Sequence, residues 1–296
     1  ANRFAEQQTL VMKFDTAIVP LASILTSMKL SKKDLPSKQR AKKAQANNSR
    51  IVILPPDISG KYFLTPDEAL CNWILTQHKQ GAIICSACAG TFILAETGLL
   101  NHRPATTHWN LAEQLSKKYL NIQVNSEKIL INDGDLITAG GLMSWLDLGL
   151  ELVAQFMQPA VMRQLGKFLV VDTAPREQRY YRSFKPKMDH GDKVIYSIQH
   201  FMQSHYSSNI SVMQLSEKSH LSERTFSRHF VGATGLNANE YLQRIRIQKA
   251  CELLETSTHT FETIAYNVGY EDVSACRKAF IKIVGLTPRD FKARFI

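Results

Sequence analysis

Residues 215–230 read LSEKSHLSERTFSRHF, and residues 264–280 read IAYNVGYEDVSACRKAF. The second stretch repeats the first with an offset of 49 positions before a central turn and 50 after it. In both, a short helix with a small residue, Ser216 or Ala265, leads through a turn into a second helix. This order is typical of the helix-turn-helix, and its recurrence predicts an internal duplication of that motif.

The second helix of each repeat is expected to have an inward and an outward face, after a capping residue, Ser222 or Asp272. The predicted inward positions, four residues apart in each repeat, are Phe226, Phe230, Cys276 and Phe280. The predicted outward positions are Arg224, Ser227, Arg228, Ser274, Arg277 and Lys278, with Val273 and Ala275 near the exposed first turn. Arg and Lys donate to guanine O6 and N7, and small apolar side chains contact thymine methyl groups. These helices are therefore predicted to read base pairs of double-stranded DNA.

Residues 240–256 predict a long helix between the two repeats. It would hold the two readers at a fixed separation, as successive major grooves on one face of a duplex require, about 34 Å apart. A helical bundle without a role in DNA binding is the alternative interpretation. Two tandem units that both have a basic outward face favour DNA binding over the bundle.

Three short stretches carry a family resemblance: VGYED at 268–272, CRKAF at 276–280 and GLTPRDF at 285–291. Through them, residues 191–296 resemble the DNA-binding domain of the AraC/XylS family of regulators. The family's usual aromatic residue is replaced by Cys276. The resemblance implies that the eight outward residues face the DNA grooves, that the protein is an activator, and that RNA polymerase is a further partner.

Strand and helix signals alternate before this helical region. Apolar runs at residues 51–56 and 81–88 predict buried strands, and residues 129–141 predict a hairpin around an Asn-Asp-Gly turn. Residues 91–100 and 144–157 predict helices. The alternation predicts an α/β domain of three layers with a largely parallel sheet.

The 296-residue chain has a formal net charge of +10, which is compatible with a polyanionic partner. The excess lies mainly at Lys29–Arg50, which predicts a solvated loop or a phosphate-attracting arm, and at Arg176–Lys187. Residues 172–190 are predicted to be a linker between a sensor and dimerisation domain (1–171) and the DNA-binding domain (191–296).

Five scattered cysteines indicate free thiols and a cytoplasmic protein. No stretch approaches the roughly 18 consecutive apolar residues of a membrane span, and no pattern predicts a metal or a cofactor. The tryptophans Trp73, Trp109 and Trp145 are expected to be core residues rather than an aromatic cage.

Residues 81–95, GAIICSACAGTFILA, predict a strand, a tight turn and a helix. A cysteine at such a turn, here Cys88, is expected to be exposed beside the positive end of the helix, which favours the thiolate. His108 is a candidate base for it, and Trp109 follows His108.

A second resemblance rests on four stretches: CAG at 88–90, GLL at 98–100, TTHW at 106–109 and AGG at 139–141. They resemble the class I glutamine amidotransferase-like and PfpI superfamily, and within it the GlxA-like regulators. The resemblance implies a flavodoxin-like, amidotransferase-type fold. It also implies an acidic residue near the elbow, a role that cannot be assigned to Glu6 or Asp15.

Three interpretations of Cys88 and His108 stay open: a pocket that senses a small metabolite, with Trp109 in its lining, a structural turn, and retained hydrolase-type catalysis. The first interpretation predicts a non-enzymatic transcription regulator that binds DNA as a homodimer and responds to a small-molecule effector. The alternative is a cysteine amidohydrolase or hydratase fused to a DNA-binding domain.

Overall fold

The computed structural model describes residues 51–56, 62–157 and 159–296. By its internal contacts the chain divides into two compact units, residues 1–178 and 179–296. The predicted linker, residues 172–190, spans the boundary between them. The predicted basic loop at Lys29–Arg50, and also Glu6 and Asp15, lie outside the described residues.

The first unit is built on a four-stranded sheet in the order β1-β2-β6-β5. Strands β1 (Ile51–Leu54), β2 (Ile83–Ala87) and β6 (Leu136–Ala139) are parallel, and β5 (Leu130–Asn132) runs antiparallel to β6. The last pair is the hairpin predicted from the Asn-Asp-Gly turn. Two short parallel strands, β3 (Pro104–Ala105) and β4 (Gln123–Val124), form a second sheet.

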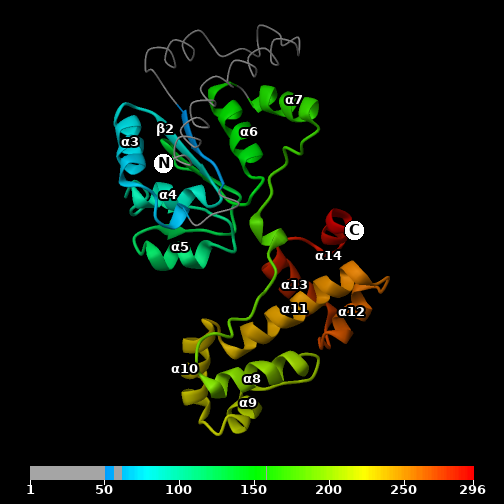
Figure 1. Ribbon diagram of the computed structural model, residues 1–296. Coiled ribbons are helices and arrows are strands. Elements are labelled where there is room, and N and C mark those ends of the chain that lie inside the picture. Colours follow the sequence, from blue (N-terminus) through cyan, green and yellow to red (C-terminus); the bar gives the residue numbers. More distant parts are fainter. Residues whose placement is uncertain (1–50, 57–61, 158) are drawn as a thin grey trace. The chain divides into compact units, whose positions relative to one another are not determined.

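Helices cover both faces of the larger sheet (Figure 1). On one face, Val52, Leu54 and Ile84 share a core with helices α3 (Glu68–Lys79) and α4 (Gly90–Glu96). The 3-10 helix η1 (Tyr62–Leu64) and helix α5 (Ala112–Lys118) complete this face. On the opposite face, alternate strand residues pack against helix α6 (Trp145–Phe156), which in turn packs against α7 (Pro159–Leu169). The predicted three-layer α/β arrangement is confirmed.

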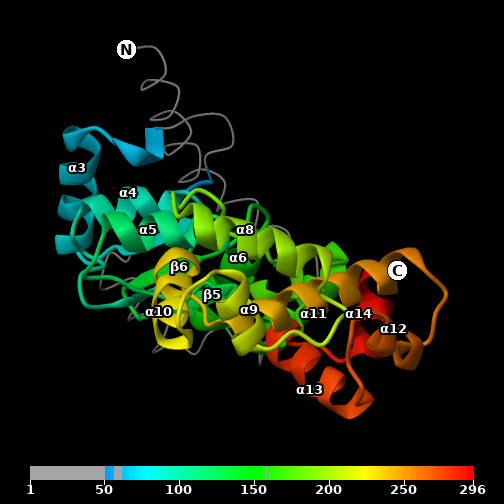
Figure 2. The same ribbon diagram turned by 90° about the horizontal axis from the view of Figure 1, so that it is seen from below.

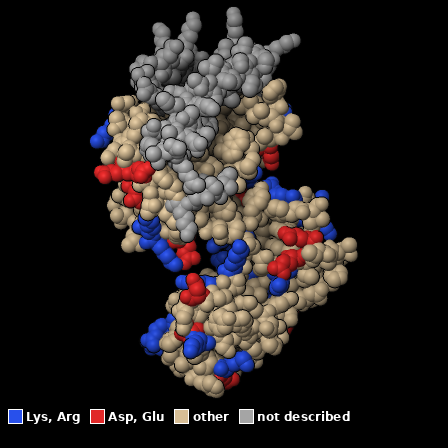
Figure 3. Space-filling model, in the orientation of Figure 1, with Lys and Arg blue, Asp and Glu red and all other residues tan. Residues whose placement is uncertain are grey.

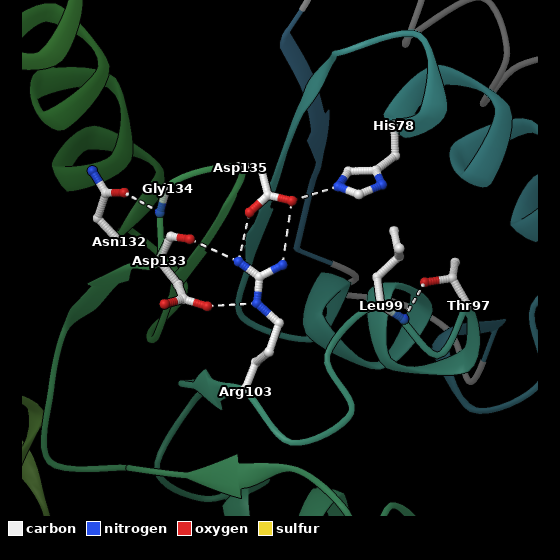
Figure 4. Close-up of polar contacts among 8 residues, drawn as sticks. All are labelled: His78, Thr97, Leu99, Arg103, Asn132, Asp133, Gly134 and Asp135. Atoms are coloured by element: carbon white, nitrogen blue, oxygen red, sulfur yellow. Dashed lines mark hydrogen bonds and ion pairs between the residues drawn. The ribbon is translucent and has the colours of Figure 1, made fainter.

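Arg103 ties the β5–β6 turn to the rest of this domain (Figure 4). Its guanidinium donates to Asp133 Oδ2 at 2.5 Å and to Asp135 Oδ1 at 2.6 Å. His78, from α3, completes the cluster with Nε2 2.6 Å from Asp135 Oδ2. The turn is therefore held from two separate elements by charged hydrogen bonds.

The expectation that all three tryptophans are core residues is wrong for two of them. Trp73 is 38% exposed and Trp145 is 49% exposed. Both lie on helices whose inward faces are filled by other residues: Cys71 and Ile74 are buried on α3, and Leu148 and Val153 on α6. On α3, helical periodicity places Trp73 away from Cys71 and Ile74. Trp145 falls on the same side as Leu148 by periodicity, but it is the first residue of α6 and its ring is exposed.

The second unit is entirely helical after a short 3-10 turn, η2 (Gln178–Tyr181). Its helices are α8 (Lys193–Ser204), α9 (Val212–Lys218), α10 (Glu223–Thr234), α11 (Ala238–Thr256), α12 (Phe261–Asn267), α13 (Val273–Val284) and α14 (Pro288–Phe295). Both ribbon views show α11 running between the two groups of shorter helices (Figures 1 and 2).

Helix α11 supplies residues to two separate hydrophobic cores. Its first half, including Tyr241 and Ile245, packs with α8, α9 and α10. Its second half, including Ile247 and Leu254, packs with α12, α13 and α14. The predicted long helix between the repeats is confirmed, and it joins them by burying one end in each core.

Candidate functional site

The two predicted reading helices, α10 and α13, begin and end in the same way. The side chain of Ser222 accepts a hydrogen bond from the backbone of Thr225, and that of Asp272 accepts from Ser274 and Ala275. Gly235 and Gly285 end the helices in the left-handed conformation, with φ of 74° and 84°. These caps satisfy backbone groups that a helix leaves unpaired at its ends, so local sequence sets both boundaries.

The turns before α10 and α13 also share their geometry. In the first, the backbone N–H of Leu221 donates to Ser216 O at 3.1 Å, and in the second, that of Tyr270 donates to Ala265 O at 3.0 Å. Both Ser216 and Ala265 are buried. The predicted duplication therefore extends to backbone hydrogen bonds.

The inward residues of both reading helices are buried as predicted, namely Phe226, Phe230, Cys276 and Phe280. Seven of the eight predicted outward residues are exposed: Arg224, Ser227, Arg228, Ser274, Ala275, Arg277 and Lys278. The eighth, Val273, is half-buried and packs against the second core. Its packing follows from its place three residues before Cys276, on the edge of the inward face.

Two residues that the sequence interpretation missed extend these outward faces. Val231 is 45% exposed and Ile281 is 41% exposed. Each lies three residues after an outward basic residue, Arg228 or Lys278, and the two positions are equivalent in the repeat. The i, i+3 spacing together with the 50-residue offset was the signal that would have found them.

The charge of the helical unit is mixed on the side that Figure 3 shows, where the Lys and Arg side chains of the described residues alternate with Asp and Glu. One outward cation also has a partner within the protein. The Arg277 guanidinium lies 5.6 Å from the centre of the Phe261 ring. The side that Figure 3 draws therefore carries no broad basic field over its described residues.

Cys88 lies at the elbow between β2 and α4, as the sequence predicts. Its backbone is left-handed, with φ of 53°, which is uncommon for a residue other than glycine. The Cys88 N–H donates to Ala139 O at 2.8 Å, and its carbonyl accepts from Thr107 Oγ1 at 2.7 Å. Hydrogen bonds from both neighbouring segments thus hold the strained turn in place.

The expected exposure and acidity of the Cys88 thiol are not found. Cys88 is only 6% exposed, and burial raises the pKa of its thiol despite a weaker, opposing backbone hydrogen bond. Burial also lowers the pKa of His108. Desolvation penalises the charged forms of both groups, so burial disfavours the thiolate at Cys88 and the imidazolium at His108.

Cys88 and His108 are linked indirectly, because the Cys88 carbonyl accepts a hydrogen bond from the side chain of Thr107, the residue before His108. Within the described residues, the thiol and the imidazole form no hydrogen bond with each other. His108 Nδ1 instead accepts from the backbone N–H of Asn110 at 3.1 Å, and its ring lies 5.3 Å from the ring of Trp109. The third predicted pocket residue, Trp109, is half-buried.

Gln178 is a buried residue of this region that sequence patterns did not reveal. Its Nε2 donates to Thr106 Oγ1, to Thr107 O and to Lys128 O at 2.9–3.0 Å, and its Oε1 accepts from the Trp109 N–H at 2.9 Å. A side chain on Gly140 would place its Cβ 2.0 Å from Gln178 Nε2. The glutamine therefore needs a glycine opposite it, and it fixes the segment that carries His108.

Among the described residues, no group of three or more His, Cys, Asp or Glu side chains is arranged to hold a metal ion. In the same part of the chain, each helix is too short or too polar to cross a membrane. All five cysteines have free thiols, as their spacing predicts.

Known families match both parts of the chain. Residues 215–294 match the helix-turn-helix domain family, and residues 12–155 match the DJ-1/PfpI family. The fold and the site thus define a DNA-binding module joined to a DJ-1/PfpI-type α/β domain.

Several transcriptional regulators resemble both parts of the chain at low identity. The chain is similar to the HTH-type transcriptional regulators CdhR of Pseudomonas aeruginosa (25% identical, covering 76% of this chain and 67% of CdhR) and GlxA of Rhizobium meliloti (22%, 73% and 67%). It is also similar to the HTH-type transcriptional regulator GbdR of Pseudomonas aeruginosa, at 19% identity over 74% of this chain and 60% of GbdR. The chain is an AraC-type helix-turn-helix regulator with an N-terminal DJ-1/PfpI domain. It spans about two thirds of the length of the curated regulators that it matches.

Proposed function

We propose that this protein regulates transcription by binding a specific DNA sequence with α10 and α13. The observation that carries the proposal is the pair of equivalent outward faces on these helices, each set by the same caps, turn and buried aromatic or cysteine positions. In each face, residues at i, i+3, i+4 and i+7 combine basic, hydroxyl and apolar groups, starting from Arg224 and from Ser274. Base edges in the major groove present matching acceptors, donors and thymine methyl groups.

The contacts divide between specificity and positioning. Arg224, Arg228, Arg277 and Lys278 are proposed to donate to guanine or to phosphate oxygens, and Ser227, Ser274 and Ala275 to approach base edges. Val273, which is half-buried, is proposed to limit how closely the first turn of α13 approaches the groove. Val231 and Ile281 extend each face toward the next bases or toward the sugar backbone.

The N-terminal domain is proposed to be the sensor. The elbow at Cys88, with His108 and Trp109 on the adjacent segment, is proposed to bind a small-molecule effector without catalysing a reaction. A neutral, buried thiol supports this view over the hydrolase alternative, because nucleophilic attack requires the thiolate. The protein is further proposed to act in the cytoplasm as a homodimer and as an activator that contacts RNA polymerase.

A selection and mobility-shift experiment tests DNA reading directly. The purified protein is used to enrich duplexes from a random library, and the enriched duplex is compared with a scrambled duplex of the same composition. A salt-sensitive preference for the enriched duplex by at least about 10³-fold is the expected result. Equal binding to both duplexes at every salt concentration would contradict the proposal.

A Cys88→Ser variant separates sensing from catalysis. The hydroxyl keeps the size and hydrogen-bonding ability of the side chain but is a much weaker nucleophile. DNA binding and effector response are expected to survive in this variant. If the variant still folds but loses the response to an effector that the wild type converts chemically, the enzyme alternative is the better description.

A further inference from the structure

The first repeat contacts the turn of the second repeat through the loop between α8 and α9. Gly269, in the turn before α13, lies against this loop so closely that an added Cβ would be 2.4 Å from Ser207 O. The side chain of Tyr206, from the same loop, packs against both hydrophobic cores. The two repeats therefore share a second point of contact besides the backbone of α11.

Arg246 of α11 fastens this contact. Its Nε donates to Tyr206 O at 2.7 Å, and its Nη2 donates to Ser208 O at 2.8 Å. Its guanidinium carbon also lies 5.4 Å from the centre of the Tyr270 ring, which is in the turn of the second repeat. One side chain thus donates hydrogen bonds to the loop of the first repeat and packs over an aromatic ring of the second.

The position of Arg246 along α11 explains why these contacts affect the relative orientation of the two repeats. It lies between Ile245, which belongs to the first core, and Ile247, which belongs to the second. At this point α11 passes from one core to the other, and long helices are rarely straight. Two readers on one duplex tolerate little such movement, because the grooves that they enter have a fixed separation and phase.

We propose that Arg246 is a positioning residue that fixes the orientation of α13 relative to α10, and so sets the spacing between the two DNA segments that the protein reads. The inference rests on the proposed function, since it concerns how two readers act together. Arg246 acts through Tyr206, Ser208 and Tyr270 and makes no base contact in this role.

The spacing dependence of binding provides the test. The probe is the duplex enriched with the wild-type protein, and variants of it carry one, two or three extra base pairs between the two footprinted segments. The wild type is expected to lose on the order of 10-fold in affinity or more for two added base pairs, because the second reader then no longer meets its own base pairs. The Arg246→Met variant is expected to bind the original duplex more weakly but to lose less than about 3-fold on insertion, because its two readers move independently.

Arg244→Met is the matched control. Arg244 lies on the same helix, is half-buried, and forms no hydrogen bond or ring contact among the described residues. This variant loses the same charge, so it is expected to keep the steep spacing dependence of the wild type. Arg246→Met with a wild-type spacing profile, whatever its absolute affinity, would overturn the proposal.

Amide exchange tests the same contact without DNA. In Arg246→Met, exchange is expected to speed up in residues 205–209 and 268–271, and to stay unchanged in the turn of the first repeat at residues 219–222. Unchanged exchange in all three segments would overturn the positioning role even if the protein reads no DNA sequence. Arg246→Lys, which keeps the charge but lacks the planar fork, is expected to be intermediate in both measurements and serves if the methionine variant does not fold.

Discussion

His220 and Gly269 occupy equivalent positions in the two helix-turn-helix turns, and both adopt a left-handed backbone, with φ of 55° and 90°. They differ in their surroundings. His220 is exposed, whereas Gly269 faces the carbonyl of Ser207 with no room for a side chain. The duplicated turn therefore tolerates a strained histidine in the first repeat and requires glycine in the second.

Substitutions at these positions are expected to have unequal effects on stability. His220→Gly relieves a strain of about 1–2 kcal/mol but gives the unfolded chain more freedom, so the free energy of unfolding should change by less than about 1 kcal/mol. Gly269→Ala adds the strain and also displaces Ser207, so it should lose at least about 2 kcal/mol. Gly235→Ala is the control, since an added Cβ there meets open space. The account is contradicted if urea unfolding shows that Gly235→Ala is no more stable than Gly269→Ala.

Arg228 is expected to contribute to sequence discrimination. Arg228→Ala should lower the preference for the enriched duplex by about 1–3 kcal/mol if the guanidinium contacts a guanine in two places. Arg228→Lys keeps the charge and should retain non-specific binding while losing part of that preference. Lys193→Ala, an exposed position at the start of α8, controls for charge alone. Equal losses on specific and scrambled DNA would assign Arg228 to phosphate instead.

The Cys88 thiol is expected to react slowly with iodoacetamide near neutral pH. Burial raises its pKa, so the folded protein keeps the proton at pH values where the unfolded chain has begun to lose it. Stability is therefore unaffected below the unfolded pKa and falls as pH rises from there through the folded pKa, because only the unfolded chain loses the proton in that range. Mass spectrometry of the Cys88 peptide should show faster alkylation in urea than in buffer at the same pH. Faster alkylation of the folded protein would indicate a stabilised thiolate.

Gln178 is expected to stabilise the α/β domain far more than its neighbour Glu177 does. Gln178→Leu removes a partner of the Trp109 N–H and one of the partners of the Thr107 and Lys128 carbonyls, and a buried polar group that loses its hydrogen bond costs about 1–3 kcal/mol. A loss of about 2 kcal/mol in the free energy of unfolding is expected. Glu177→Gln keeps the shape of the side chain and weakens its ion pair with the exposed Lys128, so it should cost less than about 1 kcal/mol. Similar urea midpoints for the two variants would rule out this role for Gln178.

Low pH is expected to weaken the ion pairs that Arg103 forms with Asp133 and Asp135. Arg103, and to a smaller degree His78, hold the pKa of Asp135 well below its usual range. A carboxyl with a lowered pKa contributes stability above its unfolded value, and this contribution disappears as pH falls through the folded value. The free energy of unfolding of the wild type should therefore fall more steeply below about pH 4 than that of Asp135→Asn. Parallel acid profiles would show that the cluster contributes nothing through ionisation.

The boundaries of the reading helices were predictable from the sequence because they depend on nearby residues. Ser222 and Asp272 cap backbone groups two or three positions away, and the glycines Gly235 and Gly285 stop their helices locally. The hairpin at 129–141 and the buried faces of α10 and α13 follow from equally short periodicities. The class of protein rested on these local signals, repeated at a constant offset.

Burial at the elbow was not predictable in the same way. The strand-turn-helix pattern placed Cys88 at a strained turn, but the ionisation of its thiol depends on how many atoms surround it. Segments from Thr107 and Ala139, distant along the chain, supply part of that surrounding. The expected thiolate was therefore wrong although the expected turn was right.

The sequence by itself determined the two domain types, the duplicated readers and the residues that face outward from them, because hydrogen bonds and periodicities within a few positions govern these features. Only the tertiary structure decided which polar groups brace the molecule. Gln178 meets Thr106 from 72 positions away, and Arg246 meets Tyr206 from 40. Such pairs produce no periodic pattern in the sequence, because the packing of the whole chain brings the two partners together, whatever their separation along it.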